Sequence, residues 1–128
     1  MNRVSYIYYQ GRQILFLDFT DCSVSEALGI IQEAGPIIRE QKENSVLTLT
    51  DVTGARYNQE VTQAMKEFAK GNKPFVKAGA VVGLDGMKKI IYNVIAKVSG
   101  RNLSTFDDTE EAKEWLVGQW KKPSEGAH

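Results

Sequence analysis

The sequence predicts an α/β protein with a mixed, mostly parallel sheet of about five strands that starts with an antiparallel hairpin. Two runs of β-branched and aromatic residues, 4–9 and 14–19, stand on either side of a glycine turn, which is typical of a hairpin. After them, short strand patterns alternate with longer apolar stripes of helical spacing. Strands separated by helices pair in parallel through right-handed crossovers, so the predicted order is β-β-α-β-α-β-α-β-α.

The chain has 128 residues, which is near the commonest size of a domain. We therefore expect a single domain over residues 1–121. Residues 122–128, KPSEGAH, carry no apolar pattern, and we expect them to form a flexible C-terminal tail.

The predicted hairpin turns at Gly11, a residue type that readily adopts a positive φ. Its second strand is apolar on both faces, because Ile14 and Phe16 alternate with Leu15 and Leu17. Either another element or a partner subunit must then cover the face that carries Ile14 and Phe16.

The first predicted helix begins at a capping box formed by Ser23 and Glu26. Its apolar stripe runs to Ile38, but Pro36 lacks the amide that the helix needs and clashes with the preceding turn. We expect the helix to kink or to restart at Pro36.

The next predicted strand, residues 46–50, alternates Leu47 and Leu49 with Thr48 and Thr50. Because neighbouring strand residues point to opposite faces, this pattern suggests that the helices lie mainly on one face of the sheet. Five elements follow: a helical stripe from Val61 to Phe68, a strand at 75–82, a helix at 87–98, a short strand at 103–106 and a last helix after Asp108.

Charge and apolar content exclude several classes of protein. The 16 basic and 16 acidic residues cancel and are interspersed, so the field that attracts nucleic acid is missing. The apolar runs are much shorter than the roughly 20 residues that span a bilayer, so we do not expect an integral membrane protein. The absence of a secretory signal and a single cysteine, Cys22, fit a cytoplasmic protein.

The sequence also lacks the residues of the common catalytic centres. Its only histidine, His128, is the last residue, so catalysis that relies on a positioned histidine base has no candidate. No spacing of ligands predicts a metal site, and Gly83 belongs to no complete nucleotide-binding motif. We predict no catalytic residues, no cofactor and no enzymatic activity, although an enzyme that uses only carboxylates, Lys or Tyr stays open.

Two strand-to-helix corners contain the candidate binding residues. In an open parallel sheet, ligands and partners gather beyond the carboxyl ends of the strands. The functional interpretation makes these corners a binding rim, whereas the structural alternative makes them ordinary turns, with Gly54 at positive φ. The candidate residues are Asp51, Thr53, Gly54, Arg56 and Asn58 at the first corner and Gly83 and Asp85 at the second.

Several short patterns resemble the STAS fold of sporulation-type anti-sigma-factor antagonists, and more closely a divergent bacterial STAS-like group. The resemblance covers residues 14–116, about four-fifths of the chain by the matched span. It rests on LDFTD at 17–21, LTLTDVTG at 47–54, NKPFVKAGAVVG at 72–83, SGR at 99–101 and the F-x-x-x-E-E-A-K-x-W-L pattern at 106–116.

The resemblance implies a regulatory module that docks a protein partner through the corner at residues 51–58. In that family a phosphorylated hydroxyl residue at this corner controls docking. Val52 offers no hydroxyl group, so Thr53 becomes the candidate phosphoacceptor. An alternative is a carrier of a lipid or small apolar ligand, since related folds resemble lipid-transfer domains of the CRAL-TRIO type. Self-association as a homodimer is compatible with both.

Overall fold

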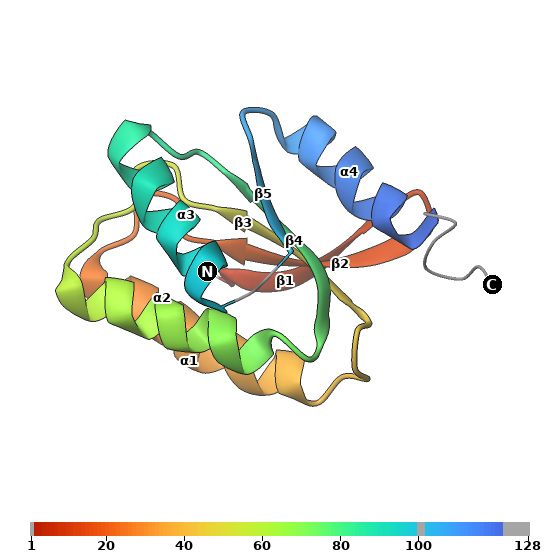
Figure 1. The fold of residues 1–128 in the computed structure, drawn as a ribbon, viewed down its shortest axis with the longest axis horizontal. Coiled ribbons are helices and arrows are strands. Elements are labelled where there is room, and N and C mark those ends of the chain that lie inside the picture. Colours follow the sequence, from red (N-terminus) through yellow and green to blue (C-terminus); the bar gives the residue numbers. More distant parts are fainter. Residues whose placement is uncertain (1, 100–101, 122–128) are drawn as a thin grey trace.

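The computed structural model describes residues 2–99 and 102–121, and the predicted tail at 122–128 lies outside them. The described residues form five strands and four helices in the predicted order. Figure 1 shows the strands as one twisted layer between helices. The strands are β1 (Val4–Tyr9), β2 (Arg12–Asp18), β3 (Val46–Asp51), β4 (Val76–Val82) and β5 (Leu103–Phe106). The helices are α1 (Val24–Arg39), α2 (Gln59–Asn72), α3 (Gly86–Ser99) and α4 (Thr109–Lys121).

The sheet has the spatial order β1-β2-β3-β4-β5, which is also the order of the chain. β1 and β2 pair antiparallel, and β2 to β5 pair in parallel, so the predicted mixed sheet is confirmed. The hairpin turns on Gln10 and Gly11, whose φ values are 50° and 80°, as a two-residue turn with two positive φ angles requires. All carboxyl ends of the parallel strands therefore lie at one edge of the sheet.

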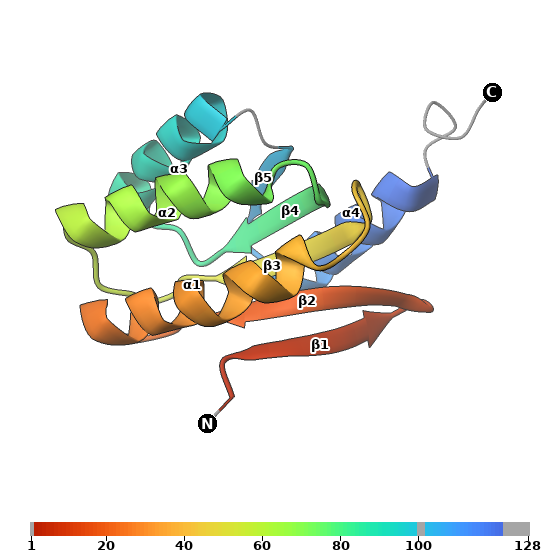
Figure 2. The same cartoon turned by 90° about the horizontal axis from the view of Figure 1, so that it is seen from below.

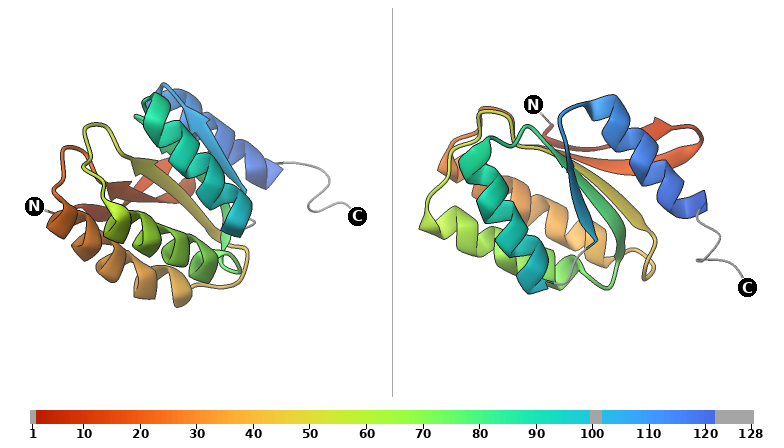
Figure 3. Two further views of the ribbon diagram at one scale, coloured as in Figure 1. Left: turned by 60° about the vertical axis from the view of Figure 1, so that its left-hand side comes forward. Right: turned by 45° about the horizontal axis from the view of Figure 1, so that its top comes forward.

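Three helices, α1, α2 and α3, cover one face of the sheet, and α4 alone covers the other (Figure 3). The prediction that helices lie mainly on one face is thus confirmed, but the occupied side differs from the one that the pattern of β3 suggested. Thr48 and Thr50 point toward the three-helix layer and are buried, whereas Leu47 and Leu49 point toward α4.

Helix α4 also provides the cover that the second face of β2 needs. Ile14 is fully buried in the same cluster as Ala112 and Leu116 of α4, and Phe16 packs against this cluster. The small side chains of Ala78 and Ala80 on β4 let the helix approach closely. An element of the same chain, and not a partner subunit, therefore covers Ile14 and Phe16.

Helix α1 is continuous through Pro36, and the expected restart does not occur. The capping box is present as predicted: Ser23 Oγ accepts from the Glu26 amide at 3.1 Å, and Glu26 Oε1 accepts from the Ser23 amide at 2.9 Å. Pro36 lies on the exposed side of the helix, where the carbonyl that loses its amide partner can turn toward water. The Glu40 amide still donates to the Pro36 carbonyl at 3.1 Å, so the ladder resumes after one missing bond.

Candidate functional site

The two predicted corners are neighbours, because β3 and β4 pair in parallel and Asp51 lies beside Val82 at their carboxyl ends. Gly83 has φ +86°, and a Cβ atom at this position would lie 2.6 Å from the Thr53 amide nitrogen. Glycine is thus required for the two loops to touch. The structure thus brings Thr53 and Gly83, one candidate residue from each corner, into contact.

The first corner is held by Asp51. Its Oδ1 atom accepts from the Thr53 amide at 3.0 Å and from the Thr53 hydroxyl at 2.7 Å. Val52 points inward and is only 1% exposed, whereas Thr53 and Gly54 are exposed. The hydroxyl group at the surface of this corner therefore belongs to Thr53 and is oriented by Asp51.

A second Asp-x-Thr corner, at the end of β2, was missed by sequence reasoning. Asp18 Oδ1 accepts from the Thr20 amide at 2.9 Å and from the Thr20 hydroxyl at 2.5 Å, which repeats the geometry of Asp51 and Thr53. Asp18 is the parallel-sheet neighbour of Asp51, so the two corners stand side by side. The sequence signal was the shared spacing in DFT and DVT.

Backbone hydrogen bonds join the loops that follow β2, β3 and β4. The Asp21 amide donates to the Thr53 carbonyl at 2.8 Å, and the Val52 amide donates to the Val82 carbonyl at 3.0 Å. Gly54 has φ +70°, and any Cβ there would collide with the carboxylate of Asp21. We call these three loops, residues 18–22, 51–58 and 83–85, the corner surface.

The other predicted residues lie around this surface in different roles. Arg56 is exposed, and its amide donates to the Cys22 carbonyl at 3.1 Å. Asn58 is the N-cap of α2, where its Oδ1 accepts from the Val61 amide at 2.8 Å. Asp85 Oδ1 accepts from the Lys88 amide at 3.0 Å in the first turn of α3. Asn58 and Asp85 thus serve as capping side chains, as the structural alternative for these corners implies.

Lys88 is a further residue of this region that sequence reasoning did not identify. Its Nζ atom donates to the Val52 carbonyl at 3.2 Å, lies 3.9 Å from Asp85 Oδ2, and is 5.5 Å from the centre of the Tyr57 ring. A positive charge thus lies beneath the corner that carries Thr53. Only the position of Lys88 in the first turn of α3 hinted at this role in the sequence.

Two ionisable side chains in the loops of the corner surface, Cys22 and Tyr57, are kept neutral by burial. Burial raises the pKa of the Cys22 thiol, and Arg3 opposes this effect. Burial also raises the pKa of Tyr57 to about 12. A buried thiol with a raised pKa is a poor nucleophile, so Cys22 is a packing residue.

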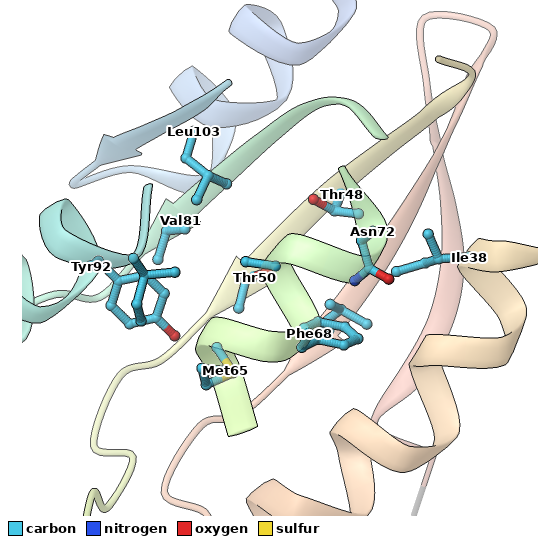
Figure 4. Close-up of a pocket in the computed structure, with 12 residues that line it drawn as sticks. Ile38, Thr48, Thr50, Met65, Phe68, Asn72, Val81, Tyr92 and Leu103 are labelled. Carbon is cyan, nitrogen blue, oxygen red and sulfur yellow. The ribbon is translucent and has the colours of Figure 1, made fainter. Parts of the chain in front are cut away.

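A small cavity of about 30 Å³ lies under the three-helix layer, between β3 and the helices α1, α2 and α3 (Figure 4). Most of its lining is apolar, but Thr48, Thr50 and Asn72 contribute polar side chains. Asn72 is completely buried, and neither its Nδ2 nor its Oδ1 atom has a hydrogen-bond partner among the described residues. Such a volume holds about one or two water molecules and is too small for a lipid chain.

No protein-family model matches the sequence, and neither does any curated protein. The structure, however, superposes on the crystal structure of an uncharacterized protein from the DUF3478 family with a SpoIIAA-like fold, from Shewanella loihica PV-4. The TM-score is 0.71 over 88% of this chain and 91% of that one, at 13% sequence identity. The fold is SpoIIAA-like. At this identity the similarity establishes the architecture alone, and it confirms the STAS-like fold that the short sequence patterns predicted.

The described residues of this SpoIIAA-like fold were also compared with the requirements of a metal site and of a membrane-spanning helix. Among the described residues, no three His, Cys, Asp or Glu side chains come together in a way that could hold a metal ion. In that same part of the chain, no helix combines the length and apolar character needed to cross a membrane.

Proposed function

We propose that this protein is a non-enzymatic interaction and regulatory module that docks a protein partner through the corner surface. The observation that carries the proposal is the Thr53 hydroxyl group, which is exposed, oriented by Asp51 and held on a rigid turn. The backbone bonds to the neighbouring loops fix this turn before any partner arrives. A preformed surface loses little conformational entropy on binding.

The same geometry makes Thr53 the proposed phosphoacceptor. A phosphate on Thr53 would replace the hydroxyl proton that now bonds to Asp51, and it would add about two negative charges next to the Asp51 carboxylate. Lys88 beneath the corner and the exposed Arg56 are the cations within the same region. Modification would therefore remove the present hydroxyl bond and add negative charge to a surface that already carries Asp18, Asp21, Asp51 and Asp85.

The test is a pull-down from an extract of the source organism with the wild-type chain and three variants. Thr53→Glu and Arg56→Ala change the corner surface, and Thr105→Glu makes the same Thr-to-Glu change on an exposed residue of β5. We expect the two corner variants to lose partners that the Thr105 variant retains. If both corner variants retain every partner, the proposed docking surface is wrong.

A second candidate function, the carriage of a lipid or small apolar ligand, is favoured by the unpaired amide of Asn72 in a mainly apolar cavity. A polar group without a partner at such a depth costs about 1–3 kcal/mol and is often matched by a ligand or by water. Because the present cavity is only about 30 Å³, α3 would have to move outward to admit a lipid. Native mass spectrometry separates the cases: a co-purifying ligand supports the carrier, and a clean apo mass opposes it.

A further inference from the structure

Strand β1 forms one edge of the sheet, and its outer side faces no other described strand (Figure 2). In the hairpin, Tyr9 and Arg12 close a two-residue turn, so Tyr9, Ile7 and Ser5 exchange hydrogen bonds with β2. The bond from the Asp18 amide to the Arg3 carbonyl, 2.8 Å, continues the same alternation. The backbone groups of residues 4, 6 and 8 therefore point away from the sheet.

Most of the outward backbone amides of these three residues lack a hydrogen-bond partner among the described residues. The Val4 amide donates to Asn2 Oδ1 at 3.2 Å, while the outward amides of Tyr6 and Tyr8 have no partner within the described residues. The side chains of Tyr6 and Tyr8 are 40% and 71% exposed. This edge thus combines free hydrogen-bonding groups with exposed aromatic surface.

Edge strands of soluble proteins are usually protected by charges, prolines or bulges. Residues 4–9, VSYIYY, contain no charge and no proline, and their register with β2 is continuous. The nearest charge, Arg3, is turned inward, with its Nη1 atom donating to the carbonyls of Asp18 and Thr20 at 3.1 and 2.9 Å. Residues 4–9 therefore lack the usual protection against pairing along this edge.

We propose that β1 pairs antiparallel with β1 of a second copy of this chain, which makes one continuous sheet through a two-fold dimer. A second copy fits because a strand without charges meets no like charge when it faces itself. A charged peptide would find no ion pair along the strand. Pairing centred on Tyr6 uses the outward groups of residues 4, 6 and 8 in about six hydrogen bonds and places Tyr8 opposite Val4 of the second copy.

The first test is sedimentation velocity over a series of concentrations, with one edge variant and one matched control. Tyr8→Lys puts a charge on the edge, where two copies bring it close to the opposite strand. Met87→Lys places the same charge on α3 at a residue that is also 71% exposed. We expect the wild type and the Met87 variant to approach twice the mass of one chain with rising concentration, and the Tyr8 variant to remain at one chain.

The second test is amide hydrogen exchange at low and high concentration. We expect the amides of Tyr6 and Tyr8 to exchange at least several-fold more slowly at high concentration, while the Ile7 amide, already bonded to β2, stays protected in both. A wild-type chain that remains monomeric at every concentration overturns the proposal. A dimer that survives Tyr8→Lys and disappears with Met87→Lys also overturns it, because the interface would then lie on α3.

Discussion

At the scale of single residues, the contact between Gly83 and Thr53 decides how closely the loops of the corner surface can approach. Gly83 combines a positive φ with a backbone neighbour on the side where a Cβ would stand. Gly54 also has a positive φ, but there the space for a Cβ is taken by the side-chain carboxylate of Asp21. These glycines are therefore structural requirements of the surface that presents Thr53.

Replacement of Gly83 by alanine should lower the free energy of unfolding by about 2 kcal/mol or more. Alanine is strained at the positive φ of this position, and its Cβ atom would collide with the backbone of Thr53. Gly29→Ala is the matched control, because Gly29 lies in α1 with open space at its Cβ position and should gain about 0.5–1 kcal/mol. Urea denaturation of both variants checks this, and equal stabilities would contradict it.

Tyr57 should make stability fall at alkaline pH. Burial raises its pKa to about 12 from the ordinary value of 10.0, so the unfolded chain loses the phenolic proton first. The stabilising contribution is complete below pH 10 and is lost as the pH rises toward 12. Tyr92, whose pKa burial also raises, adds a loss of the same sign.

Tyr57→Phe should therefore reduce the loss of stability between pH 10 and 12 without removing it. At neutral pH the variant should stay within about 1 kcal/mol of the wild type, because the Tyr57 hydroxyl lies against the phenol of Tyr92 and its removal costs at most about one hydrogen bond. Thermal unfolding recorded across this pH range is the measurement. An unchanged alkaline slope would show that Tyr57 titrates alike in both states.

At the scale of elements, helix starts were predictable because their chemistry is local. The capping box of α1 needs only Ser23 and Glu26, three residues apart, and the structure contains both of its bonds. The same holds for the positive φ of Gly11 at the hairpin turn. Pro36 was misjudged because its effect depends on which side of the helix faces water, and that is a property of the packed molecule.

Removal of the N-cap should measure how much this local chemistry contributes. Ser23→Ala removes the oxygen that accepts from the Glu26 amide and should cost about 1 kcal/mol. Ser25→Ala makes the same change two residues further on, at an exposed position inside α1, and should be neutral or slightly stabilising. Chemical denaturation distinguishes the two; a Ser25 variant that is as unstable as the Ser23 variant would point to helix propensity instead.

The candidate site was only partly predictable for the same reason. Turn chemistry identified Asp51, Thr53, Gly54 and Gly83, because these residues act on their own loop or the next one. The bond from Lys88 to the Val52 carbonyl spans 36 positions in the sequence and has no local pattern. Likewise, the spacing of the threonines and leucines in β3 could not show which face the three helices occupy.

At the scale of the whole molecule, the sheet separates two hydrophobic cores, and the helices that cover them differ in number. Three helices share one face, while α4 alone shields Ile14, Leu47 and Leu49 on the other. Leu116 and Ala112 are the fully buried residues of α4 in this cluster, and Leu116 is the larger of the two. Substitutions of buried residues in α4 should therefore lower the stability of the fold strongly.

Leu116→Ala should lower the free energy of unfolding by about 2–5 kcal/mol, since α4 has no neighbouring helix on its face that could close the cavity. Val94→Ala on α3 is the control, because Val94 is half exposed and its truncation should change little. Calorimetry of both variants checks the difference. A small effect at Leu116 would mean that α4 is loosely packed.

The agreement between the spatial order of the strands and their order in the chain has a consequence for synthesis on the ribosome. When a new strand leaves the exit tunnel, the strand with which it pairs has already been synthesised. β2 can pair with β1, and β3, β4 and β5 can then add in turn. No strand has to insert between two others, so the sheet can grow from one edge. The α4 face stays uncovered until the end, and a nascent chain stalled before residue 109 would expose Ile14, Leu47 and Leu49 to chaperones.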